Sequence, residues 1–102
     1  MSLTKTHAKN GAKCKVTFRI PADIGGPILR AHVAGEFNGW DPTAAPMRKL
    51  KDGSFSLTMT LPTGKDYQFR YVLDNENWVS EWQADAYVRT SYGDCENSVL
   101  RL

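Results

Sequence analysis

The apolar residues of this 102-residue chain recur with a period of two, the spacing of a β-strand that has one buried face. The alternation is most regular in segment 54–61, where Phe55, Leu57, Met59 and Leu61 are separated by serine and threonine. The other alternating segments are 15–20, 29–37, 66–73, 78–82 and 97–102. No window of a dozen residues has the apolar spacing of an amphipathic helix. The sequence therefore predicts an all-β fold.

Turn-forming residues lie between the alternating segments. Asp52-Gly53 is a typical hairpin signal, and Pro62-Thr63-Gly64 and Tyr92-Gly93-Asp94 are expected to reverse the chain again. Segment 41–46, which contains two prolines, is expected to hold at most one helical turn. About seven short antiparallel strands, with turns every eight to twelve residues, favour an immunoglobulin-like β-sandwich.

Length and composition indicate one ordinary globular domain, because 41% of the residues are hydrophobic and 24% are charged. We expect residues 1–13 to form a flexible N-terminal arm and residues 14–102 to form the domain. Lysine and arginine are scattered and the net charge is only +2, which disfavours nucleic acid as a partner.

The N-terminal segment lacks the apolar stretch of a secretion signal, and no apolar run is long enough to cross a membrane. We therefore expect a cytoplasmic protein with no membrane partner. Cys14 and Cys95 are then expected to be free thiols, because the cytoplasm keeps thiols reduced. A disulfide between them stays open as the alternative, since they lie near the starts of the first and last strands.

The charged residues do not form a recognisable catalytic arrangement. The nearest approach to an acidic cluster is Asp74, Glu76, Glu81 and Asp85, which we interpret as solvated acids of turns and strand edges rather than a glycosidase pair. His7 and His32 have no cysteine or acid at metal-ligand spacing. We expect a binding protein rather than an enzyme, with no metal and no cofactor.

One segment, 33–42, predicts an exposed aromatic residue. Asn38-Gly39 tolerates positive φ, and Asp41-Pro42 resists continuation of the strand, so Trp40 lies on a stiff corner where a strand cannot bury it. Trp78 shares a strand face with Ser80 and Trp82, so Trp78 is either a surface residue or one of a pair in which one tryptophan covers the core beside the other.

Flat aromatic rings and forked polar groups are the side chains that sugars require. Pyranose rings pack their C–H faces on tryptophan, and Trp40 and Trp78 suit that contact. Neighbouring hydroxyls are bound by a guanidinium or a side-chain amide, and Arg70 and Asn97 suit that role. In segment 66–73 the alternation predicts that Gln68, Arg70 and Val72 point outward. Tyr92 is expected at a hairpin tip.

Several motifs follow one another over segment 15–102: Gly35-Glu36-Phe37-Asn38-Gly39-Trp40, Leu61-Pro62-Thr63-Gly64, Tyr67-Gln68-Phe69-Arg70-Tyr71, Asp74 with Trp78, and Tyr92-Gly93 with Asn97-Ser98-Val99-Leu100. In this order they resemble the early-set domains known as isoamylase N-terminal domains or family-48 carbohydrate-binding modules, which include the glycogen-binding domain of AMP-activated kinase β subunits. The resemblance implies an immunoglobulin-like sandwich that binds α-1,4-linked glucan, as polysaccharide or oligosaccharide.

The resemblance also implies roles for single residues. Trp40 and Trp78 take the positions of the two stacking tryptophans, and Arg70 takes that of a basic residue, usually lysine, between them. Tyr92 stands where the kinase domains have a leucine at a hairpin tip. Asn97 resembles the polar residue that begins the last strand, with Glu96 as the neighbouring candidate.

The alternative interpretation is a protein-interaction module of the same fold. Such a module would dock to a glycogen-metabolism enzyme or another partner through an edge strand or through the segment from Trp78 to Trp82.

Overall fold

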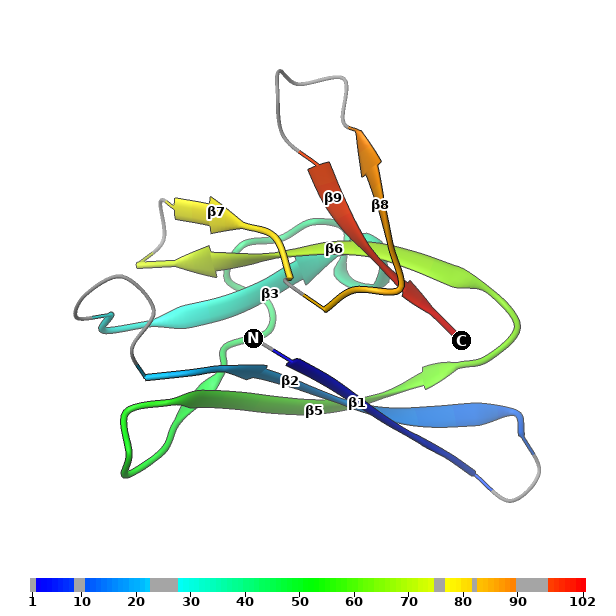
Figure 1. Cartoon of the computed structure of the whole chain (residues 1–102), viewed down its shortest axis with the longest axis horizontal. Helices are drawn as coiled ribbons and strands as arrows, with labels where there is room; N and C mark the ends of the chain where they lie inside the picture. The colour runs from blue at the N-terminus through cyan, green and yellow to red at the C-terminus, as the bar shows by residue number, and fades with distance from the viewer. Residues whose placement is uncertain (1, 9–10, 23–27, 75–76, 82, 90–95) are drawn as a thin grey trace.

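Two antiparallel β-sheets form the computed structural model of the chain, shown in Figure 1. The structure describes residues 2–8, 11–22, 28–74, 77–81, 83–89 and 96–102. The first sheet has the order β1-β2-β5-β4, with strands β1 (Ser2–His7), β2 (Lys13–Ile20), β5 (Phe55–Pro62) and β4 (Arg48–Lys49). The second sheet has the order β3-β6-β9-β8, with strands β3 (Ala31–Gly35), β6 (Asp66–Leu73), β9 (Glu96–Arg101) and β8 (Ala86–Arg89). Strand β7 (Asn77–Val79) also pairs with β6, and the 3-10 helix η1 (Glu36–Asn38) follows β3.

The core lies between the two sheets and is formed by the apolar half of each alternating segment. Phe18 of β2 is fully buried, and its ring lies 5.2 Å from that of Phe69 and 6.3 Å from that of Tyr71, centroid to centroid. Both contacts are edge-on, an arrangement that aromatic pairs prefer. The predicted all-β sandwich is confirmed. The two sheets pack together because the period-two pattern gives each strand one apolar face that must be removed from water.

The N-terminal residues differ from the expected flexible arm. Ser2–His7 form β1, which pairs with β2 from Ser2 opposite Arg19 to His7 opposite Cys14. Leu3 packs against the core, and Lys5 Nζ forms an ion pair with Asp85 and donates to the carbonyl oxygen of Arg101 in the other sheet. The expectation rested on side-chain polarity, whereas the strand forms because its backbone satisfies the donors and acceptors along the edge of β2.

Three further expectations need correction. The second strand ends at Gly35 rather than Phe37, because the chain turns into η1. Segment 41–46 contains no helix, which agrees with the expected limit of one helical turn. Val72 is on the outer face as expected, yet it is fully buried, because larger neighbours cover it. Glu81 is fully buried rather than solvated. The short strands β4 and β8 were not predicted.

Two other expectations concerned free cysteine thiols and the lack of a segment that crosses a membrane. Cys14 is a free, buried thiol, and Cys95 lies outside the described residues. No helix in the described part of the chain has the length and apolar character needed to span a membrane.

Candidate functional site

The turn that carries Trp40 begins at Gly35, a position that only glycine can occupy. Gly35 is extended and lies against β6, where an added Cβ would approach the carbonyl oxygen of Gln68 to 2.6 Å and Cβ of Phe69 to 2.8 Å. Phe37, two residues later, directs its ring into the sandwich, 6.1 Å from the rings of both Phe18 and Tyr67. The motif therefore joins the end of β3 firmly to the core.

Asn38 closes the same turn with its side-chain amide. Its Oδ1 accepts from the backbone N–H of Gly35 at 3.0 Å, and its Nδ2 donates to the carbonyl oxygen of Val33 at 2.9 Å. The N–H of Trp40 donates to the carbonyl oxygen of Gly35 at 2.9 Å. These bonds hold Trp40 on the predicted corner at the end of β3, but its side chain is half-buried rather than exposed, because the turn folds back against the end of the strand.

Trp40 has a φ of +61°, in the left-handed region that favours glycine. A side chain in this conformation costs on the order of 1 to 2 kcal/mol. Backbone strain of this kind persists where the surroundings enforce it, and such positions concentrate at functional sites. The fold therefore holds a large aromatic residue at a position where glycine would be less strained.

The outer face of the second sheet, the face turned away from the core, brings other predicted residues together. Register places Arg70 of β6 opposite Ala34, and places Val72 opposite both His32 and Trp78. Residues directly opposite one another share a face, so Arg70 and Trp78 lie on the outer face. The Nη2 of Arg70 donates to the carbonyl oxygen of Trp78 at 2.8 Å. Trp78 is 37% exposed, which favours a surface residue over a residue of the core edge, and Trp82 lies outside the described residues.

Asn97 belongs to the same outer face, and the neighbouring candidate Glu96 does not. Asn97 is opposite Val88, and Gln68 is opposite Val99, so Asn97 and Gln68 point to the side that carries Arg70. Asn97 Nδ2 donates to Oε1 of Gln68 at 3.0 Å. Glu96 points to the other face because side chains alternate along a strand. The predicted site residue Tyr92 lies outside the described residues.

The outer face includes small residues that are fully buried. Ala34 and Val72 are fully buried although they point away from the core, so larger side chains of this face cover them. His32 Nδ1 and Arg70 Nε are buried and have no hydrogen-bond partner among the described residues. Gln68 was not predicted from the sequence as a site residue. Its position two residues before Arg70, on the same face of the strand, could have indicated it.

The described acidic residues of the cluster that the sequence suggested each have a different hydrogen-bond or ion-pair partner. Oδ1 of Asp74 accepts from the backbone N–H groups of Leu29 and Arg30, at 2.9 and 3.0 Å. Oε1 of Glu81 accepts from the hydroxyl of Tyr71 at 2.8 Å. Asp85 forms its ion pair with Lys5, and Glu76 lies outside the described residues. Within the described ranges, no three His, Cys, Asp or Glu side chains gather as a metal site requires.

Asp41, next to Trp40, is an acid whose ionised form is stabilised locally. Its Oδ1 accepts from both the backbone N–H and the hydroxyl of Thr43, each at 2.9 Å. These two bonds lower the pKa of Asp41 below its usual value, with the backbone bond the larger cause. The residue that follows Trp40 therefore carries a negative charge at neutral pH.

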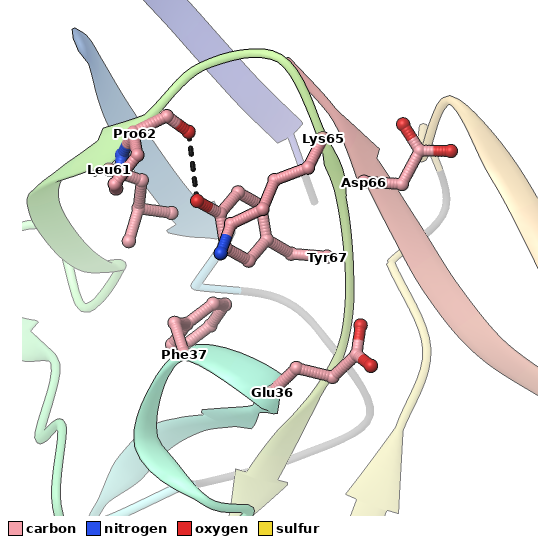
Figure 2. Close-up of a pocket in the computed structure, with 7 residues that line it drawn as sticks. All are labelled: Glu36, Phe37, Leu61, Pro62, Lys65, Asp66 and Tyr67. Atoms are coloured by element: carbon pink, nitrogen blue, oxygen red, sulfur yellow. Dashed lines mark hydrogen bonds between the residues drawn. The ribbon is translucent and has the colours of Figure 1, made fainter.

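A pocket of about 460 Å³ opens at a different place, between η1 and the turn that joins β5 to β6 (Figure 2). It is lined by Glu36, Phe37, Leu61, Pro62, Lys65, Asp66 and Tyr67. The hydroxyl of Tyr67 donates to the carbonyl oxygen of Pro62 at 2.8 Å, and Lys65 Nζ lies 5.0 Å from the centroid of the Tyr67 ring. Tyr67 is only 4% exposed, so this pocket offers no open tyrosine face for stacking and contains none of the predicted site residues.

A β-sandwich with a shallow face of half-exposed aromatic and polar side chains has the architecture of a binding domain. Residues 29–88 match carbohydrate-binding module 48, the isoamylase N-terminal domain, and the chain belongs to this family. The matched domain is a non-catalytic binding module, and the match includes Trp40, Arg70 and Trp78. The suspected family is thereby confirmed.

Solved structures share the fold at low sequence identity. The chain is similar to a ferric enterobactin esterase of Salmonella typhimurium, with a TM-score of 0.75 at 11% identity, and to an enterobactin esterase of Shigella flexneri, with a TM-score of 0.72 at 8% identity. Both comparisons cover 98% of this chain but only 34% and 32% of those chains, so this chain spans about a third of their length. Such identities show the fold alone. The sequence matches no curated protein.

Proposed function

We propose that the outer face of the second sheet binds α-1,4-linked glucan, the chemistry of glycogen, starch and malto-oligosaccharides, without catalysing a reaction on it. The observation that carries the proposal is the bond from Arg70 Nη2 to the carbonyl oxygen of Trp78, which holds a guanidinium beside a tryptophan that is 37% exposed. A ring for stacking and a fork for hydroxyls are the two elements that a sugar-binding face needs. Membership of a carbohydrate-binding family supports the same function.

The proposed contacts are the predicted ones. Trp40 and Trp78 stack on sugar rings, Arg70 binds hydroxyls between them, and Tyr92 and Asn97 border the face. A shallow face with few stacked rings leaves little binding free energy after the entropy of association is subtracted, so we expect dissociation constants from about micromolar to millimolar.

Intrinsic tryptophan fluorescence tests the proposal directly, because two of the proposed contacts are tryptophans. Titration with maltoheptaose or β-cyclodextrin is expected to give a saturable change, while the β-linked cellopentaose gives none at the same concentration. A folded sample that shows no saturable change at millimolar α-glucan would overturn the proposal. Co-sedimentation with glycogen extends the test to the polymer.

A second candidate function is docking to an enzyme of glycogen metabolism or another protein partner. The solved chains of similar fold are about three times as long as this chain, so a unit of this architecture also occurs inside larger proteins. A pull-down that recovers a protein partner from the host, with no glucan response in the fluorescence titration, would favour this function.

We propose a cytoplasmic location for the protein. The buried thiol of Cys14 is free, as thiols of cytoplasmic proteins normally are. Immunoblotting of fractionated host cells tests the location, and recovery in the secreted fraction would contradict it.

A further inference from the structure

Two side-chain amides lie together on the outer face of the second sheet, next to Arg70. Gln68 of β6 and Asn97 of β9 are both half-buried, and Asn97 Nδ2 donates to Oε1 of Gln68 at 3.0 Å. Register pairs Phe69 with Ser98, so the next position along each strand is occupied by Arg70 and Asn97. Three polar side chains therefore follow one another across β6 and β9.

The hydrogen bond between the amides of Gln68 and Asn97 determines which of their donors and acceptors can still bind a ligand. Because Oε1 of Gln68 already accepts, this amide offers the two N–H donors of Nε2. Because only one of the two N–H groups of Asn97 Nδ2 is used in this bond, this amide offers the acceptor Oδ1 and one further donor. Arg70 has one Nη directed at the carbonyl oxygen of Trp78 and can only donate with the other. The group thus presents the donors of Gln68, Arg70 and Asn97 next to the acceptor Oδ1 of Asn97.

The backbone of Gln68 is held in the sheet by a bond that does not involve its own side chain. Its backbone N–H donates to Oε1 of Glu36 at 2.6 Å, and this bond extends the edge of β6 beyond the end of β3. These backbone bonds persist whatever side chain stands at position 68. The amide of Gln68 accepts from Asn97 Nδ2 and keeps its two N–H donors for a ligand on the outer face.

We propose that Gln68 is a further ligand-contacting residue, and that Gln68, Asn97 and Arg70 together bind the adjacent hydroxyls at C2 and C3 of one glucose unit. This inference rests on the proposed glucan binding. An internal unit of an α-1,4-linked chain keeps its C2, C3 and C6 hydroxyls, of which only C2 and C3 are neighbours on the ring. Each hydroxyl both donates and accepts, so a neighbouring pair matches alternating donors and acceptors.

Two substitutions separate contact from positioning. Gln68→Ala removes the whole amide, whereas Gln68→Glu keeps an acceptor for Asn97 Nδ2 and removes both N–H donors. We expect both variants to bind β-cyclodextrin about three- to tenfold more weakly than the parent, the range of one or two lost neutral hydrogen bonds. Gln83→Ala is the matched control, because Gln83 is an exposed glutamine that belongs to no strand of the second sheet, and it is expected to bind like the parent.

The ligand supplies the second arm of the experiment. For β-cyclodextrin methylated at every C2 hydroxyl, Gln68→Ala and the parent are expected to bind equally weakly, since the parent has already lost the contact. For β-cyclodextrin methylated at every C6 hydroxyl, the loss caused by Gln68→Ala should persist in full. The thermal midpoints of all variants are measured alongside to show that each is folded.

Each outcome decides a separate point. Parent-like binding by Gln68→Glu would overturn the direct contact, since the residue would then act only by orienting Asn97. Parent-like binding of β-cyclodextrin by Gln68→Ala would overturn the inference while leaving glucan binding intact. The same follows if Gln68→Ala weakens binding of the C2-methylated ligand as much as it weakens binding of unmodified β-cyclodextrin. Failure of the parent itself to bind β-cyclodextrin would instead overturn the proposed function.

Discussion

The hydroxyl of Tyr71 donates to Oε1 of Glu81 at 2.8 Å, inside the sandwich, where both residues are fully buried. Glu81 Oε2 accepts from the backbone N–H of Gln83, and the N–H of Glu81 donates to the hydroxyl of Ser98. Burial raises the pKa of Tyr71 above its usual value, and the charge of Glu81 and the hydrogen bond to it add to the rise. The segment that follows Trp78 is thereby tied to both β6 and β9.

Tyr71→Phe is expected to destabilise the domain by about 1 to 3 kcal/mol, because it leaves a buried carboxylate oxygen without its donor. The control is Tyr67→Phe, which removes a hydrogen bond to a neutral carbonyl, that of Pro62, and should cost about 0.5 to 1.5 kcal/mol. Urea unfolding of both variants and the parent measures the difference. Equal losses of unfolding free energy in the two variants would show that the hydrogen bond from Tyr71 to the Glu81 carboxylate stabilises the domain no more than a bond to a neutral carbonyl.

Gly35→Ala is expected to lower stability more than Gly39→Ala. The new Cβ at position 35 meets backbone and Cβ atoms that cannot move aside, while at position 39 it meets nothing within 4 Å and only the φ of +67° is strained. We expect about 3 kcal/mol or more at Gly35, from overpacking, and about 1 to 2 kcal/mol at Gly39. Thermal unfolding measures both, and the reverse order would contradict this description of the turn.

Trp40→Ala is expected to abolish most glucan binding while the free energy of unfolding falls by about 1 kcal/mol or less, as for surface substitutions. Loss of a tryptophan packed in the core would instead cost about 3 to 5 kcal/mol. Trp40→Gly should bind as poorly as Trp40→Ala but unfold at a higher temperature, because glycine relieves the positive φ. A variant that melts far below the parent, or one that retains normal binding of maltoheptaose, contradicts the proposed role.

Arg70→Lys is expected to keep the charge but weaken binding of maltoheptaose by about three- to tenfold, since an ammonium cannot hold the Trp78 carbonyl and two hydroxyls in the geometry of a guanidinium fork. Arg70→Ala should weaken binding further. Isothermal titration calorimetry gives both affinities. Equal binding by the parent and Arg70→Lys would mean that only the charge at position 70 matters.

Asp85→Asn is expected to destabilise the protein at neutral pH and to have little effect in acid. Burial raises the pKa of Asp85, but the hydrogen bonds from Lys5 and the N–H of Arg101, with the charges of Lys5 and Arg101, lower it to below its usual value. The stabilising contribution is therefore present above the unfolded-state pKa of about 3.9 and is lost as the pH falls through the lower pKa of the folded state. We expect a difference of about 0.5 to 1 kcal/mol at pH 7, the scale of a partly exposed ion pair.

Thermal midpoints of the parent and Asp85→Asn across this pH range measure the effect. A difference between the two that stays constant from neutral to acid pH would contradict the assignment. The same measurement reports on β1, since Lys5 connects that strand to the second sheet.

The strands that alternate strongly could be predicted from sequence, and so could the corner at Trp40. Both depend on neighbours along the chain: the period of two in segment 54–61, and the positive φ that Asn38-Gly39 permits before Asp41-Pro42. Strand β1 could not be predicted in this way, because a polar segment gains its stability from the backbone of β2 and from Lys5 reaching Asp85, 80 positions away in sequence.

The candidate site was also predicted only in part from the sequence. The types of its residues, tryptophan, arginine and asparagine, were sufficient to propose stacking and hydroxyl binding. Which of Asn97 and Glu96 faces Arg70 is a matter of strand register, and so is the pairing of Asn97 with Gln68. Register depends on how β6 and β9 are aligned, and a shift of one residue would exchange the two faces.

The sequence by itself determined that this chain forms strands with one apolar face, and that a tryptophan follows a sharp turn at the end of one of them, because alternation and turn chemistry act between near neighbours. Only the tertiary structure decided that Glu81 is buried and hydrogen-bonded to Tyr71, that Val72 is buried, and that Gln68, Arg70 and Asn97 are neighbours on one face. Those relationships join residues from separate strands, and the packing of the sheets, rather than the local pattern, brings them together.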